Sequence, residues 1–146
     1  NFRDTLLASL FGESRPWPSE YLHHLTEVIG TIGAFGNAII VGRGANFILP
    51  KDRAFNVRIV APLETRIKYV MEDRGYSRSQ AEQYVVKKEN ERKEFMRKHF
   101  NADVADPSHY DIIVNTGSMS LDGAVEAIVS AFNKRKEAAA SQEEKK

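Results

Sequence analysis

The chain has 146 residues, a formal net charge of +1 and no cysteine, so disulfides, thiol catalysis and cysteine-held metals are excluded. An apolar fraction of 42% with 28% charged residues is ordinary for one globular domain that has a hydrophobic core. The near-zero charge and the lack of a membrane-length apolar run favour neither a nucleic acid nor a membrane as partner, and we expect a soluble, cytoplasmic protein.

Two helices are expected in the first quarter of the chain. Apolar residues at helical spacing predict a short amphipathic helix over residues 3–11 and a second helix over about 19–36. His23 and His24 are adjacent on the second helix and lack the i, i+4 spacing that places two metal ligands on one face. We therefore assign no metal site to them.

The stretch 38–49 reads AIIVGRGANFIL and contains the first candidate for a functional residue. Ala38–Val41 is a short apolar run typical of a strand buried on both faces, and it ends at Gly42, Arg43 and Gly44. Ligands of parallel sheets collect beyond the carboxyl ends of the strands, where a guanidinium suits a phosphate or carboxylate. The glycines permit close approach to such a ligand. The alternative for Arg43 is a structural pair with a nearby carboxylate.

A second strand and two helices follow. Residues 55–60 alternate as a strand does, and Pro62 begins a helix whose apolar stripe we expect to pack on the sheet before the helix ends at Gly75. The capping box at 77–80 opens a long helix that reaches about His99. Its second half, KKENERKEFMRKHF, is rich in charge, and we expect it to be mostly solvated.

The last part of the chain predicts a third strand and a final helix. The strand covers 110–114 and is followed by a polar loop at 115–118, after which Ser120 caps the helix. Residues from about Lys134 are charged, and 137–146 is expected to be a disordered tail. Helices that alternate with short apolar strands indicate an α/β fold with a parallel sheet flanked by helices. The stripe of the final helix that we expect to be buried consists of Leu121, Ala124, Val125, Ile128, Val129 and Phe132.

Three further arginines are candidates of a weaker kind. Arg92 and Arg97 lie in the basic half of the long helix, and Arg66 lies on the helix after the second strand. Spacing alone favours ordinary surface roles for them, because pairs such as Glu89 with Lys93 at i, i+4 stabilise an exposed helix face. The sequence contains no recognisable nucleophile with a base, no paired-carboxylate arrangement and no zinc spacing.

Four pieces of sequence have a familiar order and spacing. They are AIIVGRGANFIL, VRIVAPLETRI, ERKEFMRKHF and YDIIVNTGSMSLDGAV, each in a matching strand or helix context. Together, from Glu20 to about Ile128, they resemble the cytidylate-kinase-like family of bacterial nucleoside monophosphate kinases. The resemblance implies a P-loop kinase fold in one domain of residues 1–136, with a helical lid at about 76–108. It also implies ATP with Mg²⁺ as cofactor and a nucleoside monophosphate such as CMP as substrate.

The resemblance assigns roles to the residues on the acceptor side. The arginine of the Gly-Arg turn faces the monophosphate in that family, which corresponds to Arg43 between Gly42 and Gly44. Arginines of the lid close over the phosphates being transferred, and the matching positions are Arg92 and Arg97. Such roles suit phosphoryl transfer, which depends on positioning and charge neutralisation more than on covalent catalysis.

The donor side is assigned in the same way. The helix after the second strand carries an arginine toward the donor nucleotide, which corresponds to Arg66. The loop after the last strand lies beside the donor base, which places Thr116, Gly117 and Ser118 there. No residue is assigned as a metal ligand.

Two departures from the family pattern leave alternatives open. Nothing matches G-x-x-x-x-G-K-[ST] or a looser glycine-rich phosphate loop, and Val41 stands where cytidylate kinases carry an aspartate. We therefore expect a fold that is incomplete at its N-terminus, with the phosphate loop upstream of Asn1. The alternative is a kinase-derived binding or assembly module without catalysis that keeps an anion pocket around Arg43. Nucleic-acid binding through 87–98 has little support without stacking aromatics, and association with a second copy, to cover a free sheet edge, is left open.

Overall fold

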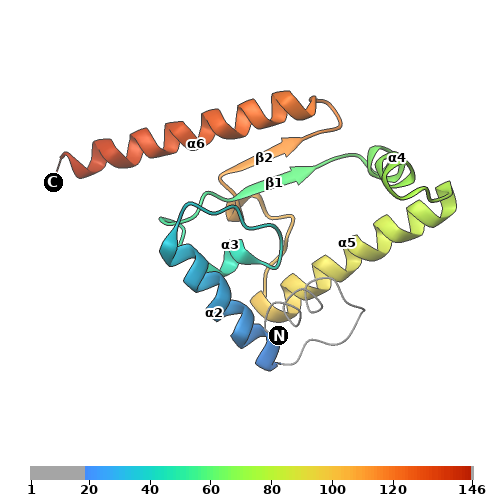
Figure 1. Ribbon diagram of the computed structural model, residues 1–146, viewed down its shortest axis with the longest axis horizontal. Helices are drawn as coiled ribbons and strands as arrows, with labels where there is room; N and C mark the ends of the chain where they lie inside the picture. Colours follow the sequence, from blue (N-terminus) through green and yellow to red (C-terminus); the bar gives the residue numbers. More distant parts are fainter. Residues whose placement is uncertain (1–18, 146) are drawn as a thin grey trace.

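The computed structural model describes residues 19–145, which form helices around a small sheet (Figure 1). The helix expected at 3–11 lies outside the described residues. In chain order the elements are α2 (Ser19–Phe35), α3 (Ala45–Ile48), β1 (Val57–Val60), α4 (Leu63–Arg74), α5 (Arg78–Phe100), a 3₁₀ turn (Pro107–His109), β2 (Ile112–Asn115) and α6 (Leu121–Glu143).

The two strands are parallel, which confirms the α/β prediction. Val57 pairs with Ile112 and Val60 pairs with Asn115. Figure 1 shows α6 beside β2, whereas α2, α3 and α5 lie on the other side of the two strands. Parallel strands need a long crossover connection, and α4 and α5 supply it here.

Two hydrophobic clusters hold the helices together, and α5 contributes to both. The α2–α3 cluster is built on Leu25, Ile29 and Ala45, and Phe95 of α5 packs against it. The α4–α5 cluster is built on Ile67, Ala81 and Val85, which are all buried. Helix α5 therefore spans the molecule from one cluster to the other.

The apolar stripe of α4 packs on α5, so the expectation that it packs on the sheet is wrong. Ile67 is 1% exposed and meets Ala81, whose small side chain lets the two helices approach closely. The connection between α4 and α5 is short, and short connections favour helices that pack as neighbours.

The predicted helix caps are confirmed. Gly75 has a φ of 67° and its N–H donates to Met71 O, which ends α4. Ser77 Oγ accepts from Gln80 N, and Gln80 Oε1 accepts from Ser77 N, so the capping box at the start of α5 is complete. Ser120 Oγ likewise accepts from Gly123 N at the start of α6.

The strand predicted at 38–41 is wrong. These residues pair with no strand of the described chain, and the side chains of Ile39 and Val41 are 95% and 88% exposed. Only Ile40 packs inward, on the α2–α3 cluster. An apolar run signals a tendency to form a strand, but a strand also needs a neighbour to complete its hydrogen bonds, and the described residues supply none there.

The stripe expected to be buried on α6 is buried only in part. Ala124 is buried, whereas Leu121, Val125, Val129 and Phe132 are exposed. The helix contacts β2 on one side only, so a face that the spacing marks as apolar has no cover among the described residues.

Helix α6 is also longer than expected. It continues to Glu143, although the sequence analysis placed the start of a charged tail near Lys134. Three consecutive alanines at 138–140 explain the extension, because alanine is the best helix former.

Candidate functional site

The Arg43 turn, residues 42–44, has an unusual backbone. Gly42, Arg43 and Gly44 have φ angles of 76°, 61° and 68°, all in the left-handed region. Glycine adopts this region freely, but for arginine it costs roughly 1–2 kcal/mol. The Arg43 side chain is half-buried. A costly conformation at a half-buried arginine marks this turn as the first candidate for a ligand site.

The Arg43 turn is held against the end of α5. A Cβ placed on Gly44 would lie 2.4 Å from the ring of Phe100, so only glycine fits at this contact. The Phe100 ring in turn stacks on Phe47 of α3, with ring centroids 5.3 Å apart. The turn therefore contacts the helix that carries the predicted lid arginines.

Arg66, in the first turn of α4, is fixed by two partners. Its Nε donates to Ala61 O over 3.0 Å, and its Nη1 donates to Glu89 Oε2 of α5 over 3.1 Å. Lys93 Nζ lies 3.1 Å from the other oxygen of the same carboxylate. Hydrogen bonds from Lys93 and then from Arg66 lower the pKa of Glu89, so the carboxylate is ionised at neutral pH.

The loop 116–118 lies against the same β1–α4 junction that holds Arg66. The N–H of Thr116 donates to Val60 O over 2.9 Å. A Cβ on Gly117 would come within 2.3 Å of a Pro62 ring carbon, so the two segments are in close contact. The structure thus brings the residues predicted for the donor nucleotide to one edge, at the carboxyl ends of β1 and β2.

Arg92 lies in line with buried residues of α5, although its own side chain is exposed. Val85, Glu89, Arg92 and Met96 follow one another at helical spacing, and Val85 and Met96 are buried. Along α5, Arg92 therefore lies between Glu89, which bonds to Arg66, and Phe100, which contacts the Arg43 turn.

Arg97 does not share this face. With 3.6 residues per turn, a separation of five residues places it about 140° around the helix from Arg92. It lines a hollow of about 350 Å³ beside Asn101–Val104. The structure therefore separates the two arginines that the sequence analysis grouped as catalytic.

The sequence analysis missed Arg58 and Tyr110. Arg58 of β1 is half-buried, and its guanidinium carbon lies 5.7 Å from the centroid of the Tyr110 ring. The Tyr110 hydroxyl donates to Val104 O over 2.8 Å. Burial raises the pKa of Tyr110, and the positive charges of Arg58 and then Arg92 partly offset this effect. A charged residue inside the apolar run VRIV is the signal that could have singled out Arg58.

The opposite ends of the strands are joined by a structural cluster. Arg135 of α6 donates to Asp111 Oδ2, to Ala54 O and to Lys51 O. Asp111 Oδ2 also accepts from the N–H of Asn56, which is buried. This cluster fixes α6 to the amino ends of β1 and β2, away from the candidate site.

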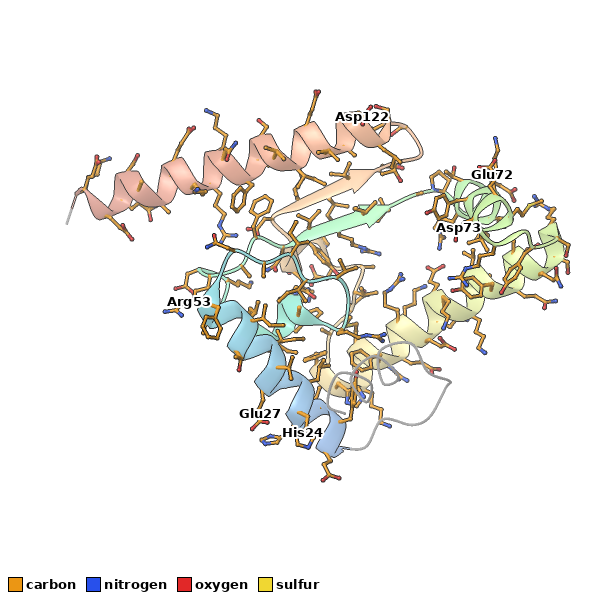
Figure 2. The ribbon with its side chains drawn as sticks, viewed as in Figure 1. His24, Glu27, Arg53, Glu72, Asp73 and Asp122 are labelled. Atoms are coloured by element: carbon orange, nitrogen blue, oxygen red, sulfur yellow. The ribbon has the colours of Figure 1, made fainter. Side chains whose placement is uncertain are left out.

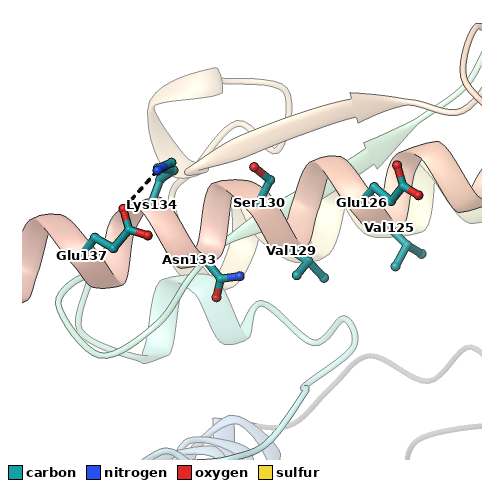
Figure 3. Close-up of a pocket in the computed structure, with 7 residues that line it drawn as sticks. All are labelled: Val125, Glu126, Val129, Ser130, Asn133, Lys134 and Glu137. Carbon is teal, nitrogen blue, oxygen red and sulfur yellow. Dashed lines mark hydrogen bonds and ion pairs between the residues drawn. The ribbon is translucent and has the colours of Figure 1, made fainter.

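Other features of the described residues carry no site. His23 and His24 pair with Glu27 on α2, and Figure 2 shows His24 and Glu27 on its outer side. A hollow of about 520 Å³ is lined by α6 alone, from Val125 to Glu137 (Figure 3). No helix among residues 19–145 is long and apolar enough to cross a membrane.

The donor set fits phosphate rather than a metal ion. Residues 19–145 contain no group of three or more histidine, aspartate or glutamate side chains that could hold a metal. Glu89, the carboxylate that pairs with Arg66, is also bonded to Lys93. These residues do not fit a protein-held Mg²⁺, which prefers carboxylate oxygens.

Comparison with known proteins identifies related sequences. The family model that matches the chain is described as the Cytidylate kinase-like family and covers residues 1–118. A cytidylate kinase of Pyrococcus horikoshii is 31% identical over 96 residues, which are 66% of this chain and 49% of that protein. A cytidylate kinase of Ignicoccus hospitalis is 30% identical over 93 residues, which are 64% of this chain and 54% of that protein.

A third relative has a different name. A uronate isomerase of Corynebacterium glutamicum is 24% identical over 98 residues, which are 66% of this chain but 19% of that protein. The chain thus spans about half the length of the two cytidylate kinases and a much smaller part of the isomerase.

Proposed function

The chain belongs to the cytidylate kinase-like family, and we propose that it forms part of a nucleoside monophosphate kinase that transfers a phosphoryl group from ATP to a monophosphate such as CMP. The observation that carries this proposal is the Arg43 turn. Three left-handed residues shape a turn whose Gly44 contacts the end of α5, and the Arg43 side chain between the glycines is half-buried. A planar guanidinium suits a phosphate, because it offers two parallel hydrogen bonds.

The other arginines have complementary roles in this proposal. Arg43, between Gly42 and Gly44, binds the acceptor phosphate, and Arg92 neutralises charge on that phosphate and on the group in transfer. Arg66, with the loop 116–118, faces the donor nucleotide. Two guanidinium groups around a transferring phosphoryl group stabilise the charge that spreads over its oxygens.

Arg97 reaches the phosphates only if α5 rotates or shifts, since it lies on another face from Arg92. MgATP as donor follows from the family, but residues 19–145 offer no acidic cluster for the ion. We therefore derive no step through the metal.

A lid over residues 76–108 is the second part of the proposal. Between Lys87 and Glu94 no side chain of α5 is buried, although Phe95 and Phe100 dock its end. We expect the amides of 87–108 to exchange hydrogen faster than those of β1 and β2, and to slow when CMP is added. Exchange as slow as in the strands, with or without CMP, would contradict the lid.

Calorimetry with CMP and cytidine tests the acceptor site. Arg43→Ala is expected to weaken CMP binding by roughly 10-fold to 100-fold, the range for a lost charge-assisted bond, and to leave the affinity for cytidine unchanged. Arg53→Ala is the matched control, because Arg53 is exposed and lies away from the site (Figure 2). Equal CMP affinity in wild type and Arg43→Ala would remove Arg43 from the site.

An activity assay separates the kinase from a binding module. Because residues 1–146 contain no phosphate loop, the full natural protein that contains this chain is incubated with MgATP and CMP, and ADP formation is followed. Turnover that is lost in Arg43→Ala supports phosphoryl transfer by this chain. CMP binding without turnover favours the non-catalytic anion-binding module, which the lack of an acidic cluster in residues 19–145 also favours.

A further inference from the structure

Arg58 is a charged side chain in the middle of a strand. Its neighbours in β1 are Val57, Ile59 and Val60, and its own side chain is half-buried over the ring of Tyr110. No carboxylate of residues 19–145 lies within ion-pair distance of it. Half-buried arginines normally have such a partner, because removing the charge from water is costly.

Arg92 of α5 also acts on Tyr110. Its side chain is exposed, but it lies at helical spacing from the buried Val85 and Met96, and its positive charge, like that of Arg58, lowers the pKa of Tyr110. No carboxylate of the described chain forms an ion pair with Arg92 either. Cations from two different elements, β1 and α5, therefore act on one phenol.

One acidic group acts on Tyr110 as well, but it does not pair with either arginine. This group is Asp103, whose Oδ1 accepts from the N–H of Ala105 over 2.8 Å. Two like charges near a half-buried ring repel each other unless an anion lies between them. The position thus offers the charge and the donors of an anion site, with Arg58 half-buried and Arg92 exposed.

We infer that Arg58 and Arg92 bind one phosphate group beside the ring of Tyr110, and that Arg58 is a further substrate-binding residue. Donors that arrive from a strand and from a helix point in different directions, which suits the tetrahedral oxygens of a phosphate better than a planar carboxylate. The identification of this phosphate as that of a nucleoside monophosphate rests on the proposed function.

Binding measurements with three probes test the inference. The affinities of CMP, cytidine and inorganic phosphate are measured by calorimetry for wild type and Arg58→Gln. Arg58→Gln is expected to weaken CMP and phosphate binding about 10-fold, the effect of one lost charge-assisted contact, and to leave cytidine binding unchanged. Arg74→Gln is the matched control, since Arg74 also lies over a tyrosine ring, with its guanidinium carbon 4.8 Å from the Tyr84 centroid.

Two further variants keep the result interpretable. Arg58→Lys retains the charge and is expected to recover part of the affinity, and urea midpoints show whether each variant is folded. Arg92→Gln combined with Arg58→Gln is expected to cost less than the sum of the single losses, because both residues bind the same group. Strictly additive losses would show two separate sites and overturn the shared one.

The outcomes distinguish this site from the proposed function. If Arg58→Gln binds CMP and inorganic phosphate as tightly as wild type does, the inference is overturned, whatever Arg43→Ala shows. If wild type binds CMP no tighter than inorganic phosphate and Arg58→Gln weakens both, the phosphate site stands and the nucleotide function fails. If wild type binds none of the three probes, both are overturned.

Discussion

Arg66 Nη1 donates to Glu89 Oε2 over 3.1 Å, and this bond joins the first turn of α4 to the middle of α5. It links the residue proposed to face the donor nucleotide with the helix proposed to act as a lid. A carboxylate that holds this guanidinium competes with any phosphate for the same donors.

Glu89→Gln is expected to tighten ATP binding. The ion pair is partly exposed, so it is worth about 0.2–1 kcal/mol. Its loss frees Arg66 for the nucleotide and is expected to raise the affinity for ATP by at most about fivefold. Fluorescence titration with an ATP analogue measures the change. Glu91→Gln is the control, because Glu91 pairs with Lys87 and Lys88. Weaker binding in Glu89→Gln, with Glu91→Gln unchanged, would mean instead that Glu89 positions Arg66 for the nucleotide.

Alanine at the two glycines of the Arg43 turn is expected to have unequal effects. Both positions have positive φ, so each substitution costs about 1 kcal/mol in backbone strain. Gly42→Ala meets open space, whereas a Cβ on Gly44 would meet the Phe100 ring. Gly44→Ala is therefore expected to lose a further ~1–3 kcal/mol of unfolding free energy by overpacking. Equal urea midpoints for the two variants would refute the contact with α5.

His99 is expected to make stability depend on pH. Burial, and then the charge of Lys98, lower its pKa, and its Nε2 is buried without a hydrogen-bond partner among the described residues. The pKa of His99 in the folded state lies below its unfolded value of about 6.5. At a pH between these two pKa values, the unfolded state therefore binds more protons than the folded state does. The stabilising contribution is complete above the unfolded pKa and declines as pH falls toward the folded one.

Urea unfolding at pH 8, 6.5 and 5 checks this prediction. Wild type is expected to lose more unfolding free energy over this range than His99→Phe, which fills the space beside Phe95 with an uncharged ring. His24→Gln, at an exposed position, is expected to keep the wild-type slope. Parallel slopes for wild type and His99→Phe would show that His99 does not contribute.

Arg135→Met is expected to destabilise the fold by about 2–4 kcal/mol. The change removes the bonds to Asp111, Ala54 and Lys51 and leaves the Asp111 carboxylate without its cation. Lys134→Met is the control, because within residues 19–145 Lys134 bonds only to Glu137 on the same helix, and the change is expected to cost at most about 0.5 kcal/mol. Similar unfolding midpoints for the two variants would contradict an anchoring role.

Local signals in the sequence predicted the helix ends well. The capping box at Ser77 and Gln80, the end of α4 at Gly75 and the cap at Ser120 depend on residues within one turn of one another. The parallel pairing of β1 and β2 followed from the order of strands and helices, although the observed strands are shorter than or shifted from 55–60 and 110–114.

Features that depend on distant residues were not predictable in the same way. The run 38–41 has strand composition but no strand beside it in the described chain. The place of Arg58 over Tyr110 depends on the fold around β1, and the separation of Arg92 from Arg97 depends on which face of α5 packs inward. The residue type indicated that the arginines could bind phosphate. Only the fold shows on which face of its helix or strand each arginine lies.

The cluster of Arg135, Asp111 and Asn56 fastens both strands at their amino ends, whereas the proposed nucleotide contacts lie mainly at the other end. Exchange of residues in the Arg43 turn or in the loop 116–118 leaves that fastening intact. Side chains at Arg43 and in the loop 116–118 can therefore be exchanged without loss of the strand pairing, whereas Gly42 and Gly44 serve both the proposed site and the fold.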